Sequence, residues 1–253
     1  MLIKPILGID VGGTGIKAAL VDPSTGEMLT EKLKILTPKP ATPASVSLII
    51  QECLRKFDYQ GPVGCGFPSV IMNDIAITAT NLDKSWINTP ISKLFSEVTG
   101  QPFYVINDAD AAGLAEMNFG AAKGIKGTVI MITIGTGVGS GIFINGALVP
   151  NTELGFLPMK GDIAERRISN VARKRSHLNW LAFGKRLNDY LTLVERLFNP
   201  EIIVVGGGIC KKWEFFSKHI LINTKVTPAL LQNNAGCIGA AYYAHLQEVT
   251  AGF

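Results

Sequence analysis

This sequence contains few cysteines, and none of them has the spacing of a metal ligand. The 253 residues include Cys53, Cys65, Cys210 and Cys237, which form neither a CxxC pair nor a Cys/His ligand set. Each lies in an apolar stretch, which favours buried free thiols in a reducing compartment. The pattern therefore predicts neither a zinc-ligand framework nor a disulfide-stapled fold.

Long apolar runs and a secretion signal are also missing. No apolar run reaches the length of a membrane span and no signal peptide precedes the first strand, so we expect a cytoplasmic protein with no membrane partner. Charged residues make up only 17% and hydrophobic residues 47%, which indicates one large globular domain or two small lobes with a sizeable core. The net charge of +4 is mildly basic rather than typical of a nucleic-acid-binding protein.

The most informative stretch is a glycine-rich turn near the N-terminus. An apolar run at residues 5–9 predicts a buried strand, and residues 18–21 predict its antiparallel return. Between them, Gly12, Gly13 and Gly15 let the backbone take positive φ and let an anion approach its N–H groups. The turn therefore predicts a polyphosphate or nucleotide phosphate ligand. A hairpin whose glycines serve only the turn is the alternative.

Polar side chains complete this turn. Thr14 adds a hydroxyl donor, and Lys17 adds a point charge for phosphate. Asp10, at the end of the strand, is suited to hold Mg²⁺ directly or through water. The stretch is neither a Walker A loop nor a Rossmann fingerprint, because no helix follows at the required spacing.

The opening pattern recurs further along the chain. Residues 129–143 again read as apolar strand, glycine turn and apolar return, and a third glycine turn follows the buried strand at residues 202–205. This recurrence suggests two related lobes that each contribute a phosphate-facing loop. The candidate donor-binding residues of these two turns are Thr133, Gly135, Thr136, Gly137, Gly206, Gly207 and Gly208.

Between these turns the apolar periodicity predicts alternating strands and helices. Further strands are expected at residues 27–36, 62–68 and 103–106, and helices at 44–57, 91–98 and 111–119. Two of these strands end in turn residues, which is where α/β proteins place ligands.

The three turns, in this order, resemble the phosphate 1, phosphate 2 and adenosine motifs of the sugar kinase/Hsp70/actin fold. Within that fold, residues 10–14 (Asp-Val-Gly-Gly-Thr), 107–108 (Asn-Asp) and 153–155 (Glu-Leu-Gly) resemble the bacterial ROK (repressor, ORF, kinase) family. Blocks similar to those of its polyphosphate glucokinases and polyphosphate/ATP glucomannokinases are residues 107–117, 149–155 and 232–236.

The resemblance implies an α/β protein with the two-lobed sugar kinase/Hsp70/actin-like (ribonuclease H-like) fold. The implied lobes are residues 1–106 and 107–253, and the C-terminal helix could pack back on the first lobe. The implied activity is transfer of a phosphoryl group from inorganic polyphosphate, with ATP as a further donor not excluded, to the 6-hydroxyl of glucose. Mg²⁺ as the cofactor and a homodimer are also implied.

Two departures from the family pattern matter. No cysteine occurs between Cys65 and Cys210, so the zinc site of typical ROK proteins cannot be built and no structural zinc is expected. Polyphosphate glucokinases resemble this sequence in that respect. The family's Glu-Leu-Gly-His motif has Phe156 in place of the sugar-contacting His, which leaves the choice among hexoses open.

The resemblance assigns Asp108 as the catalytic base, a carboxylate at a strand end that can reach the sugar 6-hydroxyl. Capping of the following helix is the alternative role for Asp108. Asn107 and Asn81 are expected to hydrogen-bond other sugar hydroxyls, and the Gly66-Phe67 turn is expected to line the pocket. Turn formation alone is the alternative for Asn81.

Two glutamates complete the expected sugar site. Glu153 is expected to accept hydrogen bonds from hydroxyls near the anomeric end of the sugar. Glu165 resembles the family's second such glutamate, because residues 165–169 keep the Glu-x-x-x-Ser spacing. Ion pairing with arginines on an exposed helix is the alternative for Glu165.

The positive charge is concentrated in one segment. Residues 160–186 carry eight basic and two acidic residues, a net charge of +6 that exceeds the +4 of the whole chain. Such a surface suits a linear polyanion, bound through many phosphate contacts with counterion release. We expect no nucleic-acid partner, because interleaved aromatics and a reading motif are lacking. The candidate donor-binding residues of the segment, with a solvated helical face as the alternative, are Arg166, Arg167, Arg173 and Lys174.

The leading hypothesis is therefore a polyphosphate-dependent hexose kinase. A strictly ATP-dependent glucokinase or glucomannokinase is the same-fold alternative, because the third turn retains an adenosine-side motif. A sugar-sensing ROK regulator would carry an N-terminal helix-turn-helix domain, for which the first strand at Ile6 leaves no room. An actin-like polymer would lack the sugar pocket that Asp108 and Glu153 predict.

Overall fold

The contacts within the chain divide it into two units. The computed structural model describes residues 4–80 and 82–251. Unit 1 consists of the chain up to Ala115 together with the chain from Asn234 onward, and unit 2 is Glu116–Asn233. This division differs from the 106/107 boundary expected from the sequence, because residues 107–115 and the C-terminal helix make their contacts within unit 1.

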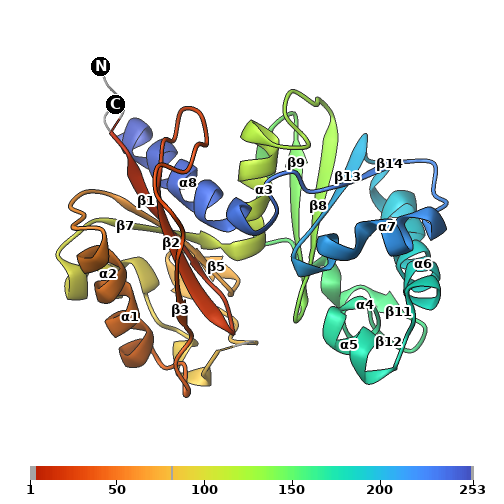
Figure 1. The fold of residues 1–253 in the computed structure, drawn as a ribbon, viewed down its shortest axis with the longest axis horizontal. Coiled ribbons are helices and arrows are strands. Elements are labelled where there is room, and N and C mark those ends of the chain that lie inside the picture. The colour runs from red at the N-terminus through yellow and green to blue at the C-terminus, as the bar shows by residue number, and fades with distance from the viewer. Residues whose placement is uncertain (1–3, 81, 252–253) are drawn as a thin grey trace. The chain divides into compact units, whose positions relative to one another are not determined.

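Unit 1 is built on a mixed sheet (Figure 1). Its strands are β1 (Ile6–Val11), β2 (Gly15–Val21), β3 (Leu33–Leu36), β4 (Val63–Phe67) and β7 (Phe103–Asn107). The spatial order is β3-β2-β1-β4-β7, with an antiparallel meander from β1 to β3 and with β4 and β7 parallel to β1. The carboxyl ends of the three parallel strands therefore meet at one edge, where ligands bind in such sheets.

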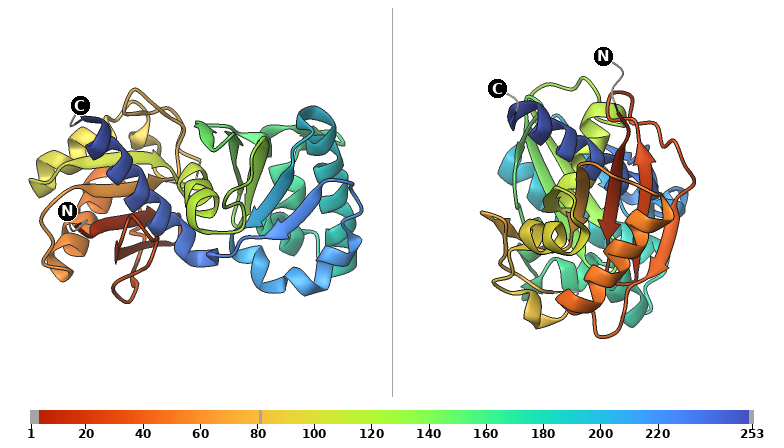
Figure 2. Two further views of the ribbon diagram at one scale, coloured as in Figure 1. Left: turned by 90° about the horizontal axis from the view of Figure 1, so that it is seen from above. Right: turned by 90° about the vertical axis from the view of Figure 1, so that its left-hand side faces the viewer.

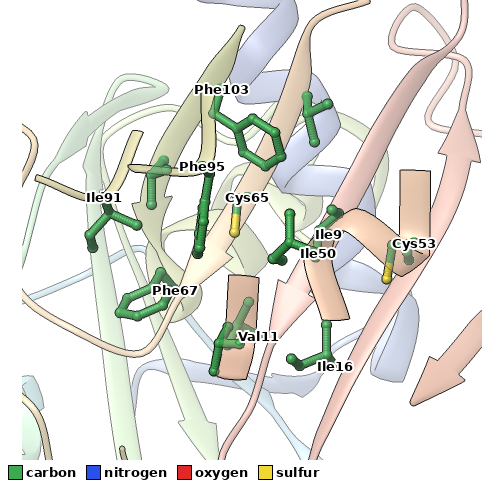
Figure 3. Packing of buried hydrophobic residues seen from close by; sticks show 14 of the residues in the cluster. Ile9, Val11, Ile16, Ile50, Cys53, Cys65, Phe67, Ile91, Phe95 and Phe103 are labelled. Carbon is green, nitrogen blue, oxygen red and sulfur yellow. The ribbon is translucent and has the colours of Figure 1, made fainter. Parts of the chain in front are cut away.

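Helices cover both faces of this sheet. They are α1 (Pro43–Lys56), α2 (Ile91–Thr99), the first part of α3 (Asp108–Phe119) and α8 (Ala235–Ala251). α1 and α2 contribute to the core around Ile9 (Figure 3), and α8 runs across the strands (Figure 2). The approach of α8 requires glycine in the sheet, because a Cβ at Gly64 would lie 1.8 Å from Ala240 O. Successive residues of a strand point to opposite faces. Ile9 therefore faces α1 and α2, whereas its neighbour Gly8 faces α8.

Short elements complete unit 1. They are the hairpin of β5 (Ile71–Met72) and β6 (Ile75–Ala76) and the single turn η1 (Lys84–Trp86). Trp86 is fully buried, and its indole N–H donates to Ala41 O. This contact holds the loop that contains η1 against the core.

Unit 2 repeats the sheet plan of unit 1. Its strands are β8 (Thr128–Ile134), β9 (Val138–Ile144), β10 (Ala147–Val149), β13 (Ile202–Gly206) and β14 (Lys225–Pro228). The order is β10-β9-β8-β13-β14, again an antiparallel meander followed by two parallel strands. The internal repeat predicted from the glycine turns is confirmed, and it extends to the whole sheet.

The remainder of unit 2 consists mostly of helices. These elements are η2 (Leu154–Phe156), β11 (Pro158–Met159), β12 (Asp162–Ile163), α4 (Glu165–Ile168), α5 (Asn170–Arg175), α6 (Trp180–Phe198), η3 (Gly208–Lys212), α7 (Trp213–Phe216), η4 (Ser217–His219) and η5 (Gln232–Asn234), of which η5 ends in unit 1. α6 supplies most of the helical side of the core, through Phe183, Leu187, Tyr190 and Leu191.

A buried carboxylate fastens the two ends of unit 2 together. Glu116 of α3 is 1% exposed. Its carboxylate accepts hydrogen bonds from the backbone N–H groups of Ala121 at 2.7 Å, Leu230 at 3.1 Å and Leu231 at 2.7 Å. A buried charge needs such donors. The segments by which the chain enters and leaves unit 2 are therefore held to one another.

Two of the element boundaries that differ from the sequence expectation have a clear physical cause. The strand predicted at 27–36 is shortened to β3, because the N–H of Leu20 is taken by the hydroxyl of Thr30 and only an isolated bridge joins Val21 to Met28. The helix predicted from Ala111 begins three residues earlier, at Asp108, because Asn107 caps it.

The cysteines lie in the buried environment that their apolar sequence neighbours predict. Cys53, Cys65 and Cys237 are buried free thiols, and Cys210 is partly buried. Burial raises the pKa of the Cys53 thiol to about 12 and that of Cys210 to about 11.

Among the helices of residues 4–80 and 82–251, none has the length and apolar character needed to cross a membrane.

Candidate active site

The end of β7 is organised by Asn107. Its side-chain Oδ1 accepts hydrogen bonds from the backbone N–H groups of Ala109 at 2.9 Å and Asp110 at 3.1 Å, and its Nδ2 donates to Ser69 O at 3.0 Å. This is the pattern of a helix N-cap. Asn107 is 8% exposed, so one amide N–H at most remains for a sugar hydroxyl.

Asp108 follows this cap at the start of α3. Helix capping was its alternative role, but Asn107 performs that function. Gly66 of β4 lies beside Asp108, because a Cβ at Gly66 would approach Asp108 Cα to 3.6 Å. The charge of Asp108 also acts on Lys17. The structure thus brings Asp108, Gly66 and Lys17 of the predicted site to the same edge of the first sheet.

The sequence predicts that Phe67 lines the sugar pocket, but its side chain lies in the core of unit 1. Its ring is fully buried, with its centroid 4.6 Å from the ring of Trp86 and 6.3 Å from that of Phe95. Figure 3 shows Phe67 and Phe95 among the packed side chains of this core. The side chain belongs to the core of unit 1, so only the main chain of the Gly66-Phe67 turn can line a pocket. The predicted sugar ligand Asn81 lies outside the described residues.

The first glycine turn is closed by its own backbone. Gly12 N donates to Gly15 O at 3.1 Å, and the hydroxyl of Thr37 donates to Gly12 O. Gly13 and Thr14 at the tip are exposed. Their N–H groups are therefore accessible to an anion, as the sequence predicts for a phosphate-facing turn.

Asp10 and Lys17 form an ion pair at the base of this turn. They are direct partners across β1 and β2, and Lys17 Nζ lies 2.6 Å from Asp10 Oδ2. Burial by itself would lower the pKa of the Lys17 ammonium. The charge and hydrogen bond of Asp10 outweigh burial, so the pKa of Lys17 is raised above its ordinary value. Lys17 is thus held in its charged form beside the turn.

Gly236 was not assigned a role from the sequence, although it belongs to a block quoted for the resemblance. It lies in the first turn of α8, where a Cβ would come within 2.6 Å of Asp10 Cγ and 2.8 Å of Asp10 Oδ2. The absence of a side chain at Gly236 therefore leaves room for the Asp10 carboxylate. The small-residue start of α8 was the signal that could have revealed it.

Asp10 is the residue in unit 1 best suited to hold Mg²⁺. Its Oδ2 pairs with Lys17, which leaves Oδ1 for the ion or for one of its water ligands. Within residues 4–80 and 82–251, no group of three or more His, Cys, Asp or Glu side chains could hold a metal by itself. One carboxylate fits the way Mg²⁺ is usually bound with phosphates, since phosphate and water oxygens supply the other ligands.

The second glycine turn has no ion pair. Gly135 N donates to Gly137 O at 2.9 Å, and Gly135 O accepts from Asn170 N of α5 at 3.0 Å. Thr136 at the tip is exposed and Thr133 is half-buried. A Cβ at Gly135 would meet no atom within 4 Å, so space is open beside this turn.

Glu165 is fastened to the same turn. Its Oε2 accepts a hydrogen bond from Val138 N at 2.9 Å. None of the ion pairs in the described residues includes Glu165, so the arginine pairing considered from the sequence is replaced by this backbone contact. Burial, and then the charge of Glu165, raise the pKa of the Glu153 carboxyl. The two glutamates predicted for the sugar therefore lie close enough to interact.

The loop that carries Glu153 is held by a serine that the sequence analysis did not single out. Ser140 of β9 is 1% exposed, donates its hydroxyl to Thr152 O and accepts from Leu154 N at 2.9 Å. Glycine is required at position 155 of the same loop, because a Cβ there would lie 2.4 Å from Val138 O. The serine directly after Gly139 was the available signal. Phe156, in place of the family's His, is 50% exposed.

The third glycine turn packs against strand β8 of unit 2. Gly207 has a φ of +79°, and a Cβ there would lie 2.5 Å from Ile134 O. Only glycine satisfies both demands. A Cβ at Gly206 would clash with Met131 at 2.4 Å, whereas Gly208 is exposed with open space beside it. Gly208 is therefore the accessible member of this turn.

The basic residues of the 160–186 segment are not equivalent. Arg166 pairs with Asp162 at 3.5 Å, and the Arg173 guanidinium lies 4.2 Å from the centre of the Trp180 ring. Lys174 is exposed, and Arg167 is half-buried. Arg173 thus already has an internal partner, which its sequence position did not indicate.

Comparison with known sequences gives matches along almost the whole chain. A model described as the ROK family matches residues 6–160. A polyphosphate glucokinase of Mycobacterium tuberculosis (strain CDC 1551 / Oshkosh) is 41% identical over 235 residues, which are 92% of this chain and 89% of that protein. A polyphosphate glucokinase of Mycobacterium leprae (strain TN) is 38% identical over 92% of this chain and 72% of its own length.

Solved structures give the same relationship. The inorganic polyphosphate/ATP-glucomannokinase from Arthrobacter sp. strain KM is 45% identical with a TM-score of 0.93, covering 96% of this chain and 99% of that one. A ROK family glucokinase from Streptomyces griseus, in complex with glucose and AMPPNP, has a TM-score of 0.85 at 24% identity and covers 96% and 100% of the two chains. The predicted two-lobed α/β fold class is confirmed by these likenesses.

Proposed function

This chain belongs to the ROK family, and from that premise we propose that it is a hexose kinase that transfers a phosphoryl group from inorganic polyphosphate to the 6-hydroxyl of glucose. Relatives with 41% and 45% identity over almost the whole chain are named for polyphosphate, which supports this donor. The second relative is also named for ATP, and we include ATP as an alternative donor. The observation that carries the chemistry is Asp108 at the end of β7, relieved of helix capping by Asn107.

Asp108 is the general base of the proposed reaction. As the sugar 6-oxygen attacks the terminal phosphorus, Asp108 takes the hydroxyl proton. A bond from the 6-oxygen to phosphorus forms, and the bond to the bridging oxygen breaks, so the polyphosphate leaves one phosphate shorter. The main chain of Gly66 and Phe67, the remaining N–H of Asn107 and the side chain of Asn81 are proposed to position the sugar.

Glu153 and Glu165 are proposed to accept hydrogen bonds from hydroxyls at the other end of the sugar. Burial, and then the charge of Glu165, raise the pKa of the Glu153 carboxyl, and a hydroxyl that donates to this carboxyl would compensate for the lost solvent. Phe156 cannot donate to a hydroxyl, so the hydrogen bond that the resemblance assigns to a His at this position has no side-chain donor here.

The donor is proposed to bind at the glycine turns. These residues are Gly12, Gly13, Thr14 and Lys17 in unit 1, and Thr133, Gly135, Thr136, Gly137, Gly206, Gly207, Gly208, Arg166, Arg167, Arg173 and Lys174 in unit 2. Asp10 would hold Mg²⁺, which when bound supplies charge neutralisation on the phosphates. Lys17 keeps its positive charge near the same phosphates because Asp10 raises its pKa.

We further propose a cytoplasmic homodimer without nucleic-acid or membrane partners. The family resemblance supports the dimer. Size-exclusion chromatography with light scattering tests it, with an expected mass of twice the 27.1 kDa of the chain.

The deciding experiment measures glucose 6-phosphate formed from glucose, Mg²⁺ and long-chain polyphosphate, with ATP in a parallel reaction. Turnover with polyphosphate that weakens steeply as salt rises would support the proposal, because polyanion binding releases counterions. Turnover with ATP alone would favour the strictly ATP-dependent glucokinase. Failure of both donors with glucose and with mannose would refute a hexose kinase.

A further inference from the structure

Two arginines of unit 2 adjoin one another without an acidic partner. Arg167 lies in α4 and Arg186 in α6, and Arg186 Nη1 donates to Arg167 O at 3.3 Å. Both residues are half-buried. None of the ion pairs within residues 4–80 and 82–251 includes either of them. Like charges held together in a partly desolvated place repel each other, and an anion bound to both would relieve that repulsion.

The state of the two side chains agrees with an anion site. Burial, and then the charge of Arg167, lower the pKa of the Arg186 guanidinium. The Nε of Arg167 is buried and has no hydrogen-bond partner in the described part of the chain. A buried donor without an acceptor is costly. Phosphate oxygens that accept from the terminal N–H groups of the two guanidinium groups would compensate both charges.

The segment that carries Arg167 is fixed to the second glycine turn on both sides. Before it, Glu165 accepts from Val138 N at 2.9 Å; after it, Asn170 N donates to Gly135 O at 3.0 Å. Two or three residues of chain span at most about 10 Å. A phosphate chain that contacts the Gly135–Gly137 turn therefore lies within a few phosphate units of Arg167.

We propose that Arg167 and Arg186 form a paired-guanidinium site that binds successive phosphates of inorganic polyphosphate beside the Gly135–Gly137 turn. This inference rests on the proposed function and adds Arg186 to it. Guanidinium groups bind phosphate oxygens through two parallel N–H donors, which suits a chain of phosphates. ATP ends in a nucleoside after three phosphates and gains less from such a site.

The test compares Arg167→Gln and Arg186→Gln with Arg175→Gln. Arg175 is a matched control because its Nη2 donates to Arg166 O at 3.1 Å, the same kind of contact that Arg186 makes one residue further along α4. We expect the KM for long-chain polyphosphate to rise about tenfold or more in the first two variants, and about twofold in the control, with kcat nearly unchanged. The KM for ATP should change less than the KM for polyphosphate. Arg186→Lys keeps the charge but loses the planar fork, so it should give an intermediate KM.

Equal effects of all three Gln variants would overturn the paired site and leave only a general charge effect. Equal losses with polyphosphate and ATP would also overturn it, by indicating a structural role. Arg167→Gln removes no hydrogen bond from Nε, so its melting temperature should match the wild type even if Arg186→Gln is destabilised.

Calorimetric titration with tripolyphosphate separates this inference from the proposed function. A wild-type enzyme that turns over ATP but not polyphosphate would refute the proposed donor. Tripolyphosphate binding that is weakened by Arg167→Gln but not by Arg175→Gln would still support the site. Absence of binding, or equal binding by wild type and Arg167→Gln, would refute the paired site.

Discussion

The two units share one strand plan but place different groups at their glycine turns. In unit 1, Asp10 lies two residues before Gly12 and faces Lys17 across the β1–β2 ladder. In unit 2, the residue two positions before Gly135 is Thr133, and it faces Gly139 across the β8–β9 ladder. One ladder therefore carries an ion pair, and the other carries a hydroxyl opposite a residue without a side chain.

This difference separates the role of the backbone from the role of charge. Both hairpins have exposed residues at the tip, Gly13 and Thr14 in the first and Thr136 in the second, so the repeat explains why either turn could face phosphate. Apart from Lys160, the basic residues of the 160–186 segment lie on α4, α5 and α6. α4 and α5 are additions to the repeated plan, whereas α6 connects β10 to β13 as α1 connects β3 to β4. We infer that the first turn is specialised for the metal and the reacting phosphate, and the second for holding the donor.

The strongest test of this division is Asp108→Asn in unit 1. Loss of a general base should lower kcat by about 10²- to 10⁴-fold while the melting temperature changes little. The measurement is glucose 6-phosphate formation at saturating glucose and donor, with circular dichroism to check folding. Turnover within tenfold of wild type would remove Asp108 from the role of base.

A matched pair of glycine substitutions compares the surroundings of the two turns, at Gly236 of α8 beside Asp10 and at Gly135 of the second turn. Gly236→Ala places a methyl 2.6 Å from Asp10 Cγ, whereas Gly135→Ala points into open space. We expect Gly236→Ala to cost about 1–3 kcal/mol of unfolding free energy and Gly135→Ala less than about 0.5 kcal/mol. Urea unfolding measures both.

Gly135→Ala should still raise the KM for the donor, because the added methyl would meet a phosphate near the turn. Equal stability losses in the two variants would contradict the difference in packing. An unchanged donor KM in Gly135→Ala would argue against a phosphate at the second turn.

The Asp10–Lys17 ion pair at the first glycine turn predicts a pH dependence that has no counterpart at the Thr133–Gly139 position of the second turn. Because the folded-state pKa of Lys17 is raised, its contribution is complete below the unfolded pKa of about 10.4 and is lost as pH rises through the folded value. Lys17→Met should therefore lose about 1 kcal/mol near pH 8, and this deficit should shrink above about pH 10.5. Urea unfolding of both proteins from pH 8 to 11 measures it. A deficit that stays constant over this range would contradict the ion-pair explanation.

The smallest expected effect concerns the glutamates of unit 2. Glu165→Gln removes the charge that contributes to the raised pKa of Glu153, so that pKa should fall part of the way to its ordinary value, the effect of burial remaining. A raised acid pKa contributes stability below the unfolded value that is lost as pH rises through the folded value. The variant should therefore lose less unfolding free energy than the wild type as pH rises above the unfolded pKa of about 4.3. Carbon-13 NMR titration of the Glu153 carboxyl measures the shift. An unchanged titration would show that the two carboxylates do not interact.

Much of the candidate site was predicted from the sequence because glycine turns are local. The three turns, the strands before them and the Asn107-Asp108 pair at a strand end all follow from residues that are neighbours in the chain. Local pattern could not decide between capping and catalysis for Asp108. The structure shows that Asn107 supplies the cap, because its amide bonds both the helix and Ser69, and the catalytic role of Asp108 stays a prediction.

Long-range contacts account for the predictions that changed. Phe67 was expected beside a ligand, yet its ring packs with Trp86 and Phe95, which are distant in sequence. Glu165 was weighed against an arginine pair, and a backbone N–H 27 residues earlier bonds it instead. The unit boundary moved because α8 returns to the first sheet through glycines whose role only packing reveals.

The sequence by itself determined the repeated strand–glycine turn–strand pattern and the charge of each segment, because apolar periodicity and glycine placement act over a few residues. Only the tertiary structure decided which charges meet. Asp10 has room because Gly236 has no Cβ, and Arg186 reaches Arg167 from another helix. Glu116 accepts from the N–H groups of Leu230 and Leu231, which are more than a hundred residues away, as well as from the nearby N–H of Ala121. Such contacts depend on three-dimensional proximity after folding. A buried charge needs a partner, and that partner can come from a distant part of the chain that folding brings close.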